Sequence, residues 1–482
     1  MNRRDLKKIV IIGAGPAGIG AALRLEEKGA EWILLERQGY VGGLAASFCR
    51  HGFVFDIGGH VLFSQNHQFN RILARHVPEE QWLRYRRVSA IRLCRRWIPF
   101  PLQLHLDGLP AVERRRCQDG LTALAKNRVR PDQSDFASFI DTHFGRGIAE
   151  LFMIPYNTKV WQFPLARMSA DWVGERIALM GQGTGKHYPS SPGSPVAPGL
   201  RSQKHCFGGV SCPVRQLPDR GVLHFRQATE PDDWGPNRCF RYPLRGGMGF
   251  LWRRLAAALP ARRIHLQSRV VGVDVRRRSV CLDHGPAIPY EALISTMPLD
   301  CLVRVAGVSR LQALARRLIH TRSHIIGLGI QGPVPESIRG YCWMYFPESR
   351  LPFYRATMLS HYSPYNAPPF HWSLLLEVSE STKHRMGGEA LLSRCIAACR
   401  REGLIRRPAQ IICTWSRRAE YGYPVPTVDR DEVLNQIIPE LEAVRIFSCG
   451  RFGAWRYEAG NMDHAFMQGY AAADRILQDL AQ

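Results

Sequence analysis

The segment KIVIIGAGPAGIGAALRL, residues 8–25, is the strongest indication of the fold class in this sequence. A run of apolar, mostly β-branched residues leads into three glycines, and an alanine- and leucine-rich stretch at helical spacing follows. This order predicts a strand, a tight turn and a helix, in which Gly13 permits the turn, Gly15 lets the backbone approach a pyrophosphate and Gly18 allows close packing. The positive N-terminus of the helix would hold the phosphates of a dinucleotide.

An acidic residue at the end of the next strand strengthens this prediction. In WILLER, residues 32–37, Glu36 lies about 20 residues beyond the glycines, where a carboxylate holds a ribose hydroxyl. A second glycine pair, Gly42-Gly43, follows in VGGLAAS, residues 41–47, and leaves room for the pyrophosphate and ribityl chain of FAD. We therefore expect an FAD site, and the sequence contains no second dinucleotide motif for a nicotinamide cofactor.

The composition indicates a globular protein of two or three domains, with 482 residues of which 45% are hydrophobic. No apolar run is long enough to span a bilayer, and the charged N-terminal residues lack a signal-type apolar region, so we expect a cytoplasmic protein. The 13 cysteines contain no C-x-x-C pair, which favours reduced thiols over disulfides. His205, Cys206 and Cys212 form an incomplete ligand pattern, so no metal site is predicted.

The formal net charge of +24 raises the question of nucleic-acid binding. The arginines, however, are spread along the chain as doublets, and aromatic residues do not alternate with them as in proteins that bind single strands. We therefore expect no nucleic-acid partner, and a basic surface that concentrates an anionic small substrate.

The spacing of apolar residues divides the chain. Helical spacing prevails in one region, strand patterns in another, and a proline- and glycine-rich stretch lies between them. We expect an α/β fold in which a Rossmann-like FAD-binding domain carries a helical insertion domain and an antiparallel β-sheet domain. The expected boundaries are 1–86 with 234–300 and 441–482 for the FAD-binding domain, 105–180 for the helical substrate domain, 181–233 for a flexible insertion, and 87–104 with 301–440 for the antiparallel sheet domain.

Two further segments suit the surroundings of a flavin ring. A strand pattern breaks at Gly58-Gly59-His60, and this arrangement fits a loop against the isoalloxazine ring as well as it fits an ordinary hydrogen-bonded loop histidine. A helix that begins near Asn461 would point its N-terminus at the flavin, where the helix dipole stabilises the negative charge of the reduced ring.

Motifs along nearly the whole chain together resemble UDP-galactopyranose mutase, in its longer eukaryotic-type form. They occur in the order found in that family, with a gap at residues 181–221. The matching stretches are GAGPAG, GGLAAS, FDIGGHVLFS, YNTKVW, WVGER, WGPN, YPLRGGMG, CWMYFP, PFYRAT, YSPYN, YGYPVPT and GRFGAWRYEAGNMDHAFM. A generic flavin oxidase would share the first two of these and little else.

The resemblance implies an isomerisation without net redox change. In the family, FAD reduced by NADPH or NADH attacks the anomeric carbon of UDP-galactopyranose through N5, UDP leaves, and the sugar recloses as a furanose before UDP returns. It also implies a UDP-sugar and NAD(P)H as small-molecule partners, and it is compatible with a homo-oligomer. Arg87 and Ser89 match positions that handle the nicotinamide cofactor in eukaryotic-type relatives.

The resemblance further implies roles for individual residues. His60 would lie beside the flavin, and Arg176 and Arg355 would clamp the diphosphate, for which guanidinium forks are better suited than ammonium groups. The implied substrate-binding residues are Gln103, Phe152, Met153, Asn157, Trp161, Asn237, Tyr345, Tyr423 and Tyr457. The implied cofactor-binding residues are Gly13, Gly15, Gly18, Glu36, Arg37, Gly42, Gly43, Val61, Val270, Arg451, Gly460, Asn461 and Met462.

Other functions stay open at this point. Phe100 replaces a tyrosine that eukaryotic-type relatives carry near the uracil, so the chain could be a mutase that acts on another sugar nucleotide. An amine-oxidase-type flavin oxidoreductase would share the first glycine motif and the RGGMG turn at residues 245–249. A basic nucleic-acid-binding protein on a flavin scaffold is the least favoured alternative.

Overall fold

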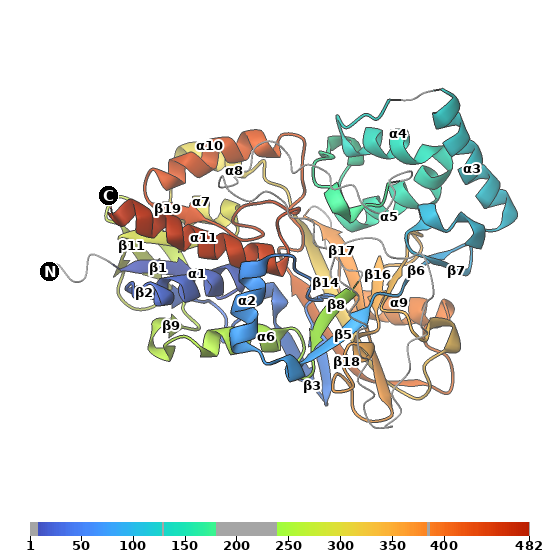
Figure 1. The fold of residues 1–482 in the computed structure, drawn as a ribbon, viewed down its shortest axis with the longest axis horizontal. Helices are drawn as coiled ribbons and strands as arrows, with labels where there is room; N and C mark the ends of the chain where they lie inside the picture. The colour runs from blue at the N-terminus through green and yellow to red at the C-terminus, as the bar shows by residue number, and fades with distance from the viewer. Residues whose placement is uncertain (1–7, 128–129, 180–238, 383–385, 482) are drawn as a thin grey trace.

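The computed structural model describes residues 8–127, 130–179, 239–382 and 386–481. Two large sheets, three smaller ones and the helices around them make up this part of the chain (Figure 1). Residues 181–233 of the expected insertion and Asn237 lie outside the described residues.

A five-stranded parallel sheet forms around the N-terminal strand. Its order is β19 (Ile446–Ser448), β13 (Ala292–Ser295), β1 (Ile9–Ile12), β2 (Trp32–Leu35) and β9 (Ile264–His265). Because successive side chains of a strand point to opposite faces, Ile9 and Ile11 join one hydrophobic core and Val10 and Ile12 join another. Sheets buried on both faces are typical of parallel α/β folds, so the Rossmann-like fold is confirmed.

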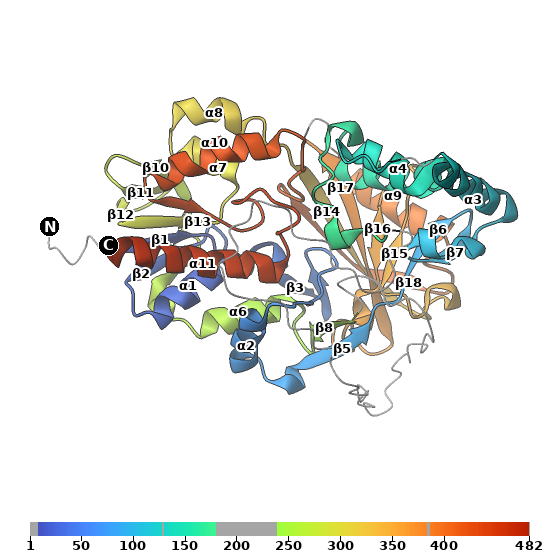
Figure 2. The same ribbon diagram turned by 45° about the horizontal axis from the view of Figure 1, so that its top comes forward.

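Different helices cover the two faces. The first face carries α1 (Pro16–Glu27), α6 (Gly249–Ala257) and α11 (Met462–Ala481), and the second carries α7 (Leu299–Val305), α8 (Ser309–Ala315) and α10 (Arg430–Glu442). The second face also bears the small sheet of β10 (Val270–Asp274), β11 (Ser279–Leu282) and β12 (Ile288–Pro289) (Figure 2).

Helices α1 and α11 lie in direct backbone contact (Figures 1 and 2). A Cβ atom on Gly20 would lie 2.2 Å from the carbonyl oxygen of Phe466, and one on Gly469 would lie 1.8 Å from that of Ala17. Because no side chain fits at either crossing, the first and last helices of the described chain pack as one unit.

A seven-stranded sheet forms the second layer of structure. Its order is β18 (Gln410–Ala419), β14 (Thr321–Gln331), β17 (His371–Ser381), β16 (Arg355–Thr357), β15 (Trp343–Tyr345), β6 (Ser89–Leu93) and β7 (Arg96–Pro99). The prediction of a purely antiparallel sheet needs one correction, because β15 and β6 run parallel. Parallel neighbours need a long crossover connection, and here the chain between β6 and β15 passes through other parts of the molecule before it returns.

The expected helical region stands beside the β6 and β7 edge of this sheet (Figure 1). It comprises α3 (Ala111–Lys126), α4 (Phe136–Ile148), a π-helical turn (Ala149–Met153) and α5 (Ile154–Trp161), which confirms helix in the described part of 105–180. Helix α9 (Gly388–Arg401) covers one face of the seven-stranded sheet. The remaining elements are α2 (His67–His76) and the strand pairs β3 (Ser47–Arg50) with β4 (Phe53–Asp56) and β5 (Trp82–Arg86) with β8 (Cys239–Pro243).

The exact division into domains stays a prediction. Helices α8 and α10 fall within the range expected for the sheet domain, yet they pack against the parallel sheet. The cysteines of the described ranges form no disulfide. None of the described helices combines the length and the apolar character needed to cross a membrane, and the described part of the chain holds no group of residues suited to a metal ion.

Candidate functional site

The two glycine motifs pack on each other at the carboxyl end of β1. Gly13 has a φ of +99°, and a Cβ on Gly18 would lie 1.8 Å from the carbonyl oxygen of Gly13. The Gly42 N–H donates to the carbonyl oxygen of Ala14 at 2.8 Å, and a Cβ on Gly43 would lie 3.2 Å from the Cα atom of Gly15. The result is a bare backbone cradle at the N-terminus of α1, which fits a pyrophosphate.

Glu36 lies at the edge of this cradle. Its carboxylate accepts hydrogen bonds from the Ala14 N–H and the Gln38 N–H, both at 2.8 Å, and keeps lone pairs for a ribose hydroxyl. The Ser268 N–H donates to the Glu36 carbonyl oxygen at 2.8 Å, so the start of β10 with Val270 lies close by. Arg37, the neighbour of Glu36, is exposed. These residues fit the adenosine end of FAD.

A cavity begins where the glycine cradle ends and extends to the seven-stranded sheet. Leu44, which follows the second glycine pair, lines it together with Gly58, Gly59 and His60. The opposite walls come from β14, β16 and β17 and from the loops around residues 419–423 and 451. The cavity therefore lies where the flavin ring of a dinucleotide held in the cradle would extend.

His60 is neutral in this cavity at physiological pH. Burial lowers the pKa of His60 to about 3, and the positive charge of Arg451 adds to the effect. Its Nδ1 atom has no hydrogen-bond partner among the described residues. A neutral imidazole with a free ring nitrogen can give or accept one hydrogen bond to a ligand without placing a charge beside it.

Glu377 is the carboxylate of this cavity, and it is not among the residues predicted from the sequence. Glu377 is 2% exposed, and Arg355 donates to it through Nε and Nη2, both at 2.7 Å. Burial by itself would raise the pKa of Glu377, but the Arg355 guanidinium holds that pKa below its ordinary value. The available signal was a single carboxylate inside the apolar strand pattern WSLLLEV, residues 372–378.

Two more arginines meet in the loop that leads into α11. Arg176 donates through Nη2 to the carbonyl oxygens of Tyr457 and Glu458 and to Asn461 Oδ1, at 3.0–3.3 Å, and its Cζ atom lies 4.4 Å from the centre of the Tyr457 ring. Arg451 donates through Nε to the Gly460 carbonyl oxygen at 2.8 Å. Within the described ranges neither arginine has a carboxylate partner, so both can neutralise an anion.

Aromatic rings form a wall beside these arginines. The Trp161 ring centre lies 4.9 Å from that of Tyr457 and 6.0 Å from that of Tyr423, and the two tyrosines are 5.5 Å apart. The Tyr423 hydroxyl lies 3.5 Å from the hydroxyl of Tyr354, a residue that the sequence analysis did not single out. The wall thus runs from the α11 loop to the neighbourhood of Glu377.

A second aromatic group continues the wall. Tyr156 lies 5.6 Å from Tyr345 and 5.2 Å from Phe152, measured between ring centres, and Phe100 lies 4.8 Å from Tyr345. Tyr156 is 6.4 Å from Tyr354, which joins the two groups. The aromatic residues expected to bind substrate therefore form one continuous set.

The remaining expected residues lie around this wall. The Asn157 amide donates to the Met153 carbonyl oxygen at 2.8 Å, and Gln103 donates to the carbonyl oxygen of Ala178. Gln103 Oε1 and Trp161 Nε1 are buried without a partner among the described residues, which leaves both for a ligand. Val61 packs where the core of the parallel sheet meets that of the helical region, and Met462 begins α11.

Comparisons with known proteins show the family of the chain. The model of the family described as flavin containing amine oxidoreductase matches residues 16–477, so the chain belongs to this family of flavoenzymes. A crystal structure of reduced UDP-galactopyranose mutase is 35% identical in sequence, with a TM-score of 0.84 over 99% of this chain and 95% of that chain. The resemblance to the UDP-galactopyranose mutase family is therefore confirmed.

Other relatives share less. Putrescine oxidase bound to putrescine has a TM-score of 0.62 at 14% identity, over 98% of this chain and 99% of that chain, which shows the fold alone. The 1-hydroxycarotenoid 3,4-desaturase of Flavobacterium sp. (strain P99-3) is 43% identical over 53 residues, which are 11% of this chain and 11% of that protein. The match to this curated relative thus spans about a tenth of its length.

Proposed function

We propose that the protein interconverts UDP-galactopyranose and UDP-galactofuranose, without net redox change, while its FAD is reduced. One observation carries the proposal: Arg176, Arg355 and Arg451 come from three separate segments and lie together beside the flavin cavity. Among the described carboxylates Glu377 alone pairs with any of them, and its partner is Arg355. The surplus of positive charge next to an aromatic wall suits a diphosphate joined to a base and a sugar.

The identity of the sugar nucleotide rests on the likeness to reduced UDP-galactopyranose mutase. A diphosphate leaving group carries two negative charges that must stay in place while the bond to the sugar breaks and forms again. Guanidinium groups held by protein carbonyls and carboxylates can do this without reorganisation. An oxidase that acts on an uncharged substrate has no use for such a group of arginines.

When bound, reduced FAD would supply the nucleophile, N5, for the anomeric carbon. The residues of this chain would hold and orient the reactants. The backbone at Gly13 and Gly15 would hold the cofactor's pyrophosphate, His60 would offer the ring a hydrogen bond without a charge, and the wall around Trp161 would exclude water. We further propose NADPH or NADH as the reductant, near Arg87, and a cytoplasmic location.

The proposal is tested with UDP-galactofuranose and the dithionite-reduced protein under anaerobic conditions, followed by chromatography of the nucleotide sugars. We expect conversion to UDP-galactopyranose by the reduced protein and none by the fully oxidised protein. Equal turnover by the oxidised protein, or a product that differs from the substrate by two hydrogens, would contradict the proposal. The second outcome would instead favour an amine-oxidase-type oxidoreductase.

A further inference from the structure

The contacts of Glu377 with Arg355 use one side of the guanidinium. Glu377 Oε1 accepts from Nε and Oε2 accepts from Nη2, each at 2.7 Å. A guanidinium has five N–H groups in a fixed plane, so this side-on pair leaves the two N–H groups of Nη1 and one of Nη2 unused by the carboxylate. The Arg355 side chain is 20% exposed and lines the cavity. The end-on pair of N–H groups is therefore available to an anion.

Glu377 is itself held in place by two other groups. The Gly59 N–H donates to Oε1 at 3.2 Å, and the Tyr354 hydroxyl donates to Oε2 at 3.0 Å. The register of the sheet also sets Arg355 directly opposite Glu377 on the neighbouring strands β16 and β17. Four hydrogen-bond donors fix the orientation of this buried carboxylate, and the carboxylate in turn fixes the orientation of Arg355.

We propose that Glu377 is a positioning residue, which holds Arg355 side-on so that the arginine presents its end-on pair of N–H groups to the diphosphate of the substrate. The inference rests on the proposed function, because it concerns the same site. Glu377 also accepts a hydrogen bond from the Gly59 N–H. The same carboxylate therefore holds both the loop that carries His60 and the arginine of the diphosphate clamp.

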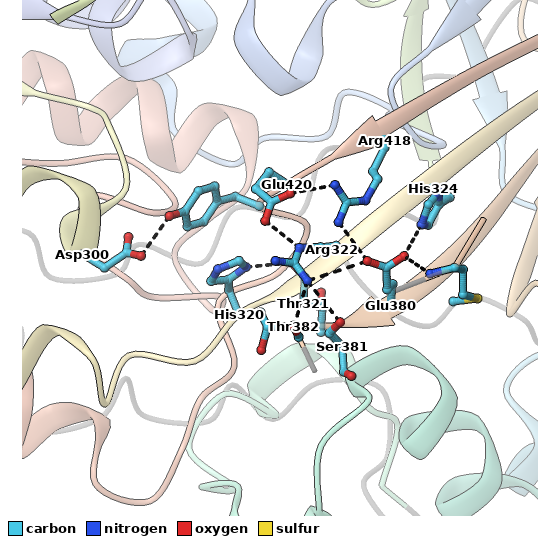
Figure 3. Close-up of polar contacts among 12 residues, drawn as sticks. Asp300, His320, Thr321, Arg322, His324, Glu380, Ser381, Thr382, Arg418 and Glu420 are labelled. Carbon is cyan, nitrogen blue, oxygen red and sulfur yellow. Dashed lines mark hydrogen bonds and ion pairs between the residues drawn. The ribbon is translucent and has the colours of Figure 1, made fainter. Parts of the chain in front are cut away.

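The same strand offers a matched control. Glu380 is 0% exposed and lies three positions from Glu377, so its side chain points to the other face of β17. Figure 3 shows Glu380 between His324 and Arg418; it lies 2.6 Å from His324 Nε2 and accepts from Arg418 Nη2 at 2.9 Å. Glu380 is thus also a buried, ion-paired glutamate, with Arg322 as a further partner, but it does not line the cavity.

The test replaces each glutamate by glutamine and measures the affinities for UDP and for inorganic pyrophosphate, the FAD occupancy and the thermal stability. We expect Glu377→Gln to weaken both affinities by about 10- to 100-fold, the range of one charge-assisted hydrogen bond, with FAD retained. Glu380→Gln should lower the melting temperature and leave both affinities unchanged. Glu377→Asp keeps the charge but shortens the reach, and it should weaken binding as well.

The sign of the effect decides between positioning and simple neutralisation. Removal of a negative charge beside an anion site strengthens anion binding if Glu377 only offsets the charge of Arg355. Unchanged or tighter binding in Glu377→Gln would therefore overturn the inference. A double-mutant cycle gives a second readout: in an Arg355→Lys background Glu377→Gln should add little, and full additivity would also overturn the inference.

The two proposals fail separately. A wild-type protein that binds pyrophosphate but does not convert UDP-galactofuranose would contradict the proposed function, while the Glu377 variants would still decide the positioning role through their pyrophosphate affinities. A wild-type protein that binds neither anion would overturn both.

Discussion

Replacement of Gly15 by valine tests the nucleotide cradle without disturbing the packing around it. A Cβ on Gly15 would meet no atom nearer than the Gly43 Cα at 4.0 Å, which is ordinary van der Waals contact. The backbone at Gly15, with φ −75° and ψ −177°, is also extended and suits a β-branched residue. The Cβ atom of the valine would therefore stand in the bare cradle at the N-terminus of α1, where a pyrophosphate would bind.

The magnitude follows from the hydrogen bonds that the cradle offers. Displacement of a pyrophosphate from two backbone N–H groups removes two charge-assisted hydrogen bonds, about 1.5–3 kcal/mol each. The affinity for FAD should fall by about two to four orders of magnitude. The apoprotein should lose less than about 1 kcal/mol, because nothing in it is crowded.

Two other glycines serve as controls. Gly39 lies near the same end of the site. A Cβ on Gly39 would meet Gln267 Cγ at 3.8 Å, so Gly39→Ala should leave FAD binding unchanged. Gly18→Ala would place a Cβ 1.8 Å from a backbone oxygen and should lower the melting temperature of the apoprotein as well as the FAD affinity. The assays are flavin absorbance per protein, FAD titration of the apoprotein and thermal unfolding. Full flavin occupancy in Gly15→Val, or an apoprotein as unstable as Gly18→Ala, would refute the reasoning.

Two further predictions concern the charged groups. Arg176→Ala and Arg355→Ala should each lower kcat/KM for UDP-galactofuranose by about 30-fold to several thousand-fold, because a partly desolvated phosphate loses a partner worth about 2–5 kcal/mol. Replacement of the exposed Arg276 by alanine is the control and should leave kcat/KM unchanged. Turnover at the wild-type rate in both variants would contradict the proposal that these two arginines bind the diphosphate. Burial alone would raise the pKa of Glu380, but contacts with His324 and Arg418 lower it from 4.5 to about 2. Since the folded pKa is the lower one, the stabilisation is present above pH 4.5 and is lost as the pH falls towards 2. Between pH 4.5 and 3 the melting temperature of the wild type should therefore fall faster than that of Glu380→Gln. Parallel curves of melting temperature against pH would contradict this prediction.

The parts of the fold that depend on residues close together in the sequence could be predicted from the sequence. The cradle follows from the glycine spacing, since Gly13 and Gly18 have local steric roles and Gly15 leaves the backbone bare. Glu36 follows from its place at the end of a strand. Helices such as α4 follow from apolar spacing.

Long-range pairings could not be predicted in the same way. Glu377 meets Arg355 only because the register of β16 and β17 sets them opposite each other, and the parallel contact of β6 with β15 joins distant segments. Apolar spacing also shows that α8 and α10 have a buried face, but it does not say which sheet that face covers.

The close crossing of α1 and α11 has a consequence for biosynthesis. A ribosome releases α1 and the first glycine loop well before β19 and α11, which complete the sheet and cover α1 at Gly20 and Gly469. The nascent chain therefore carries α1 without the helix that covers it until α11 has been made, and the packing behind the glycine loop is complete only then. A chaperone that shields α1 in that interval would act on this protein before FAD can.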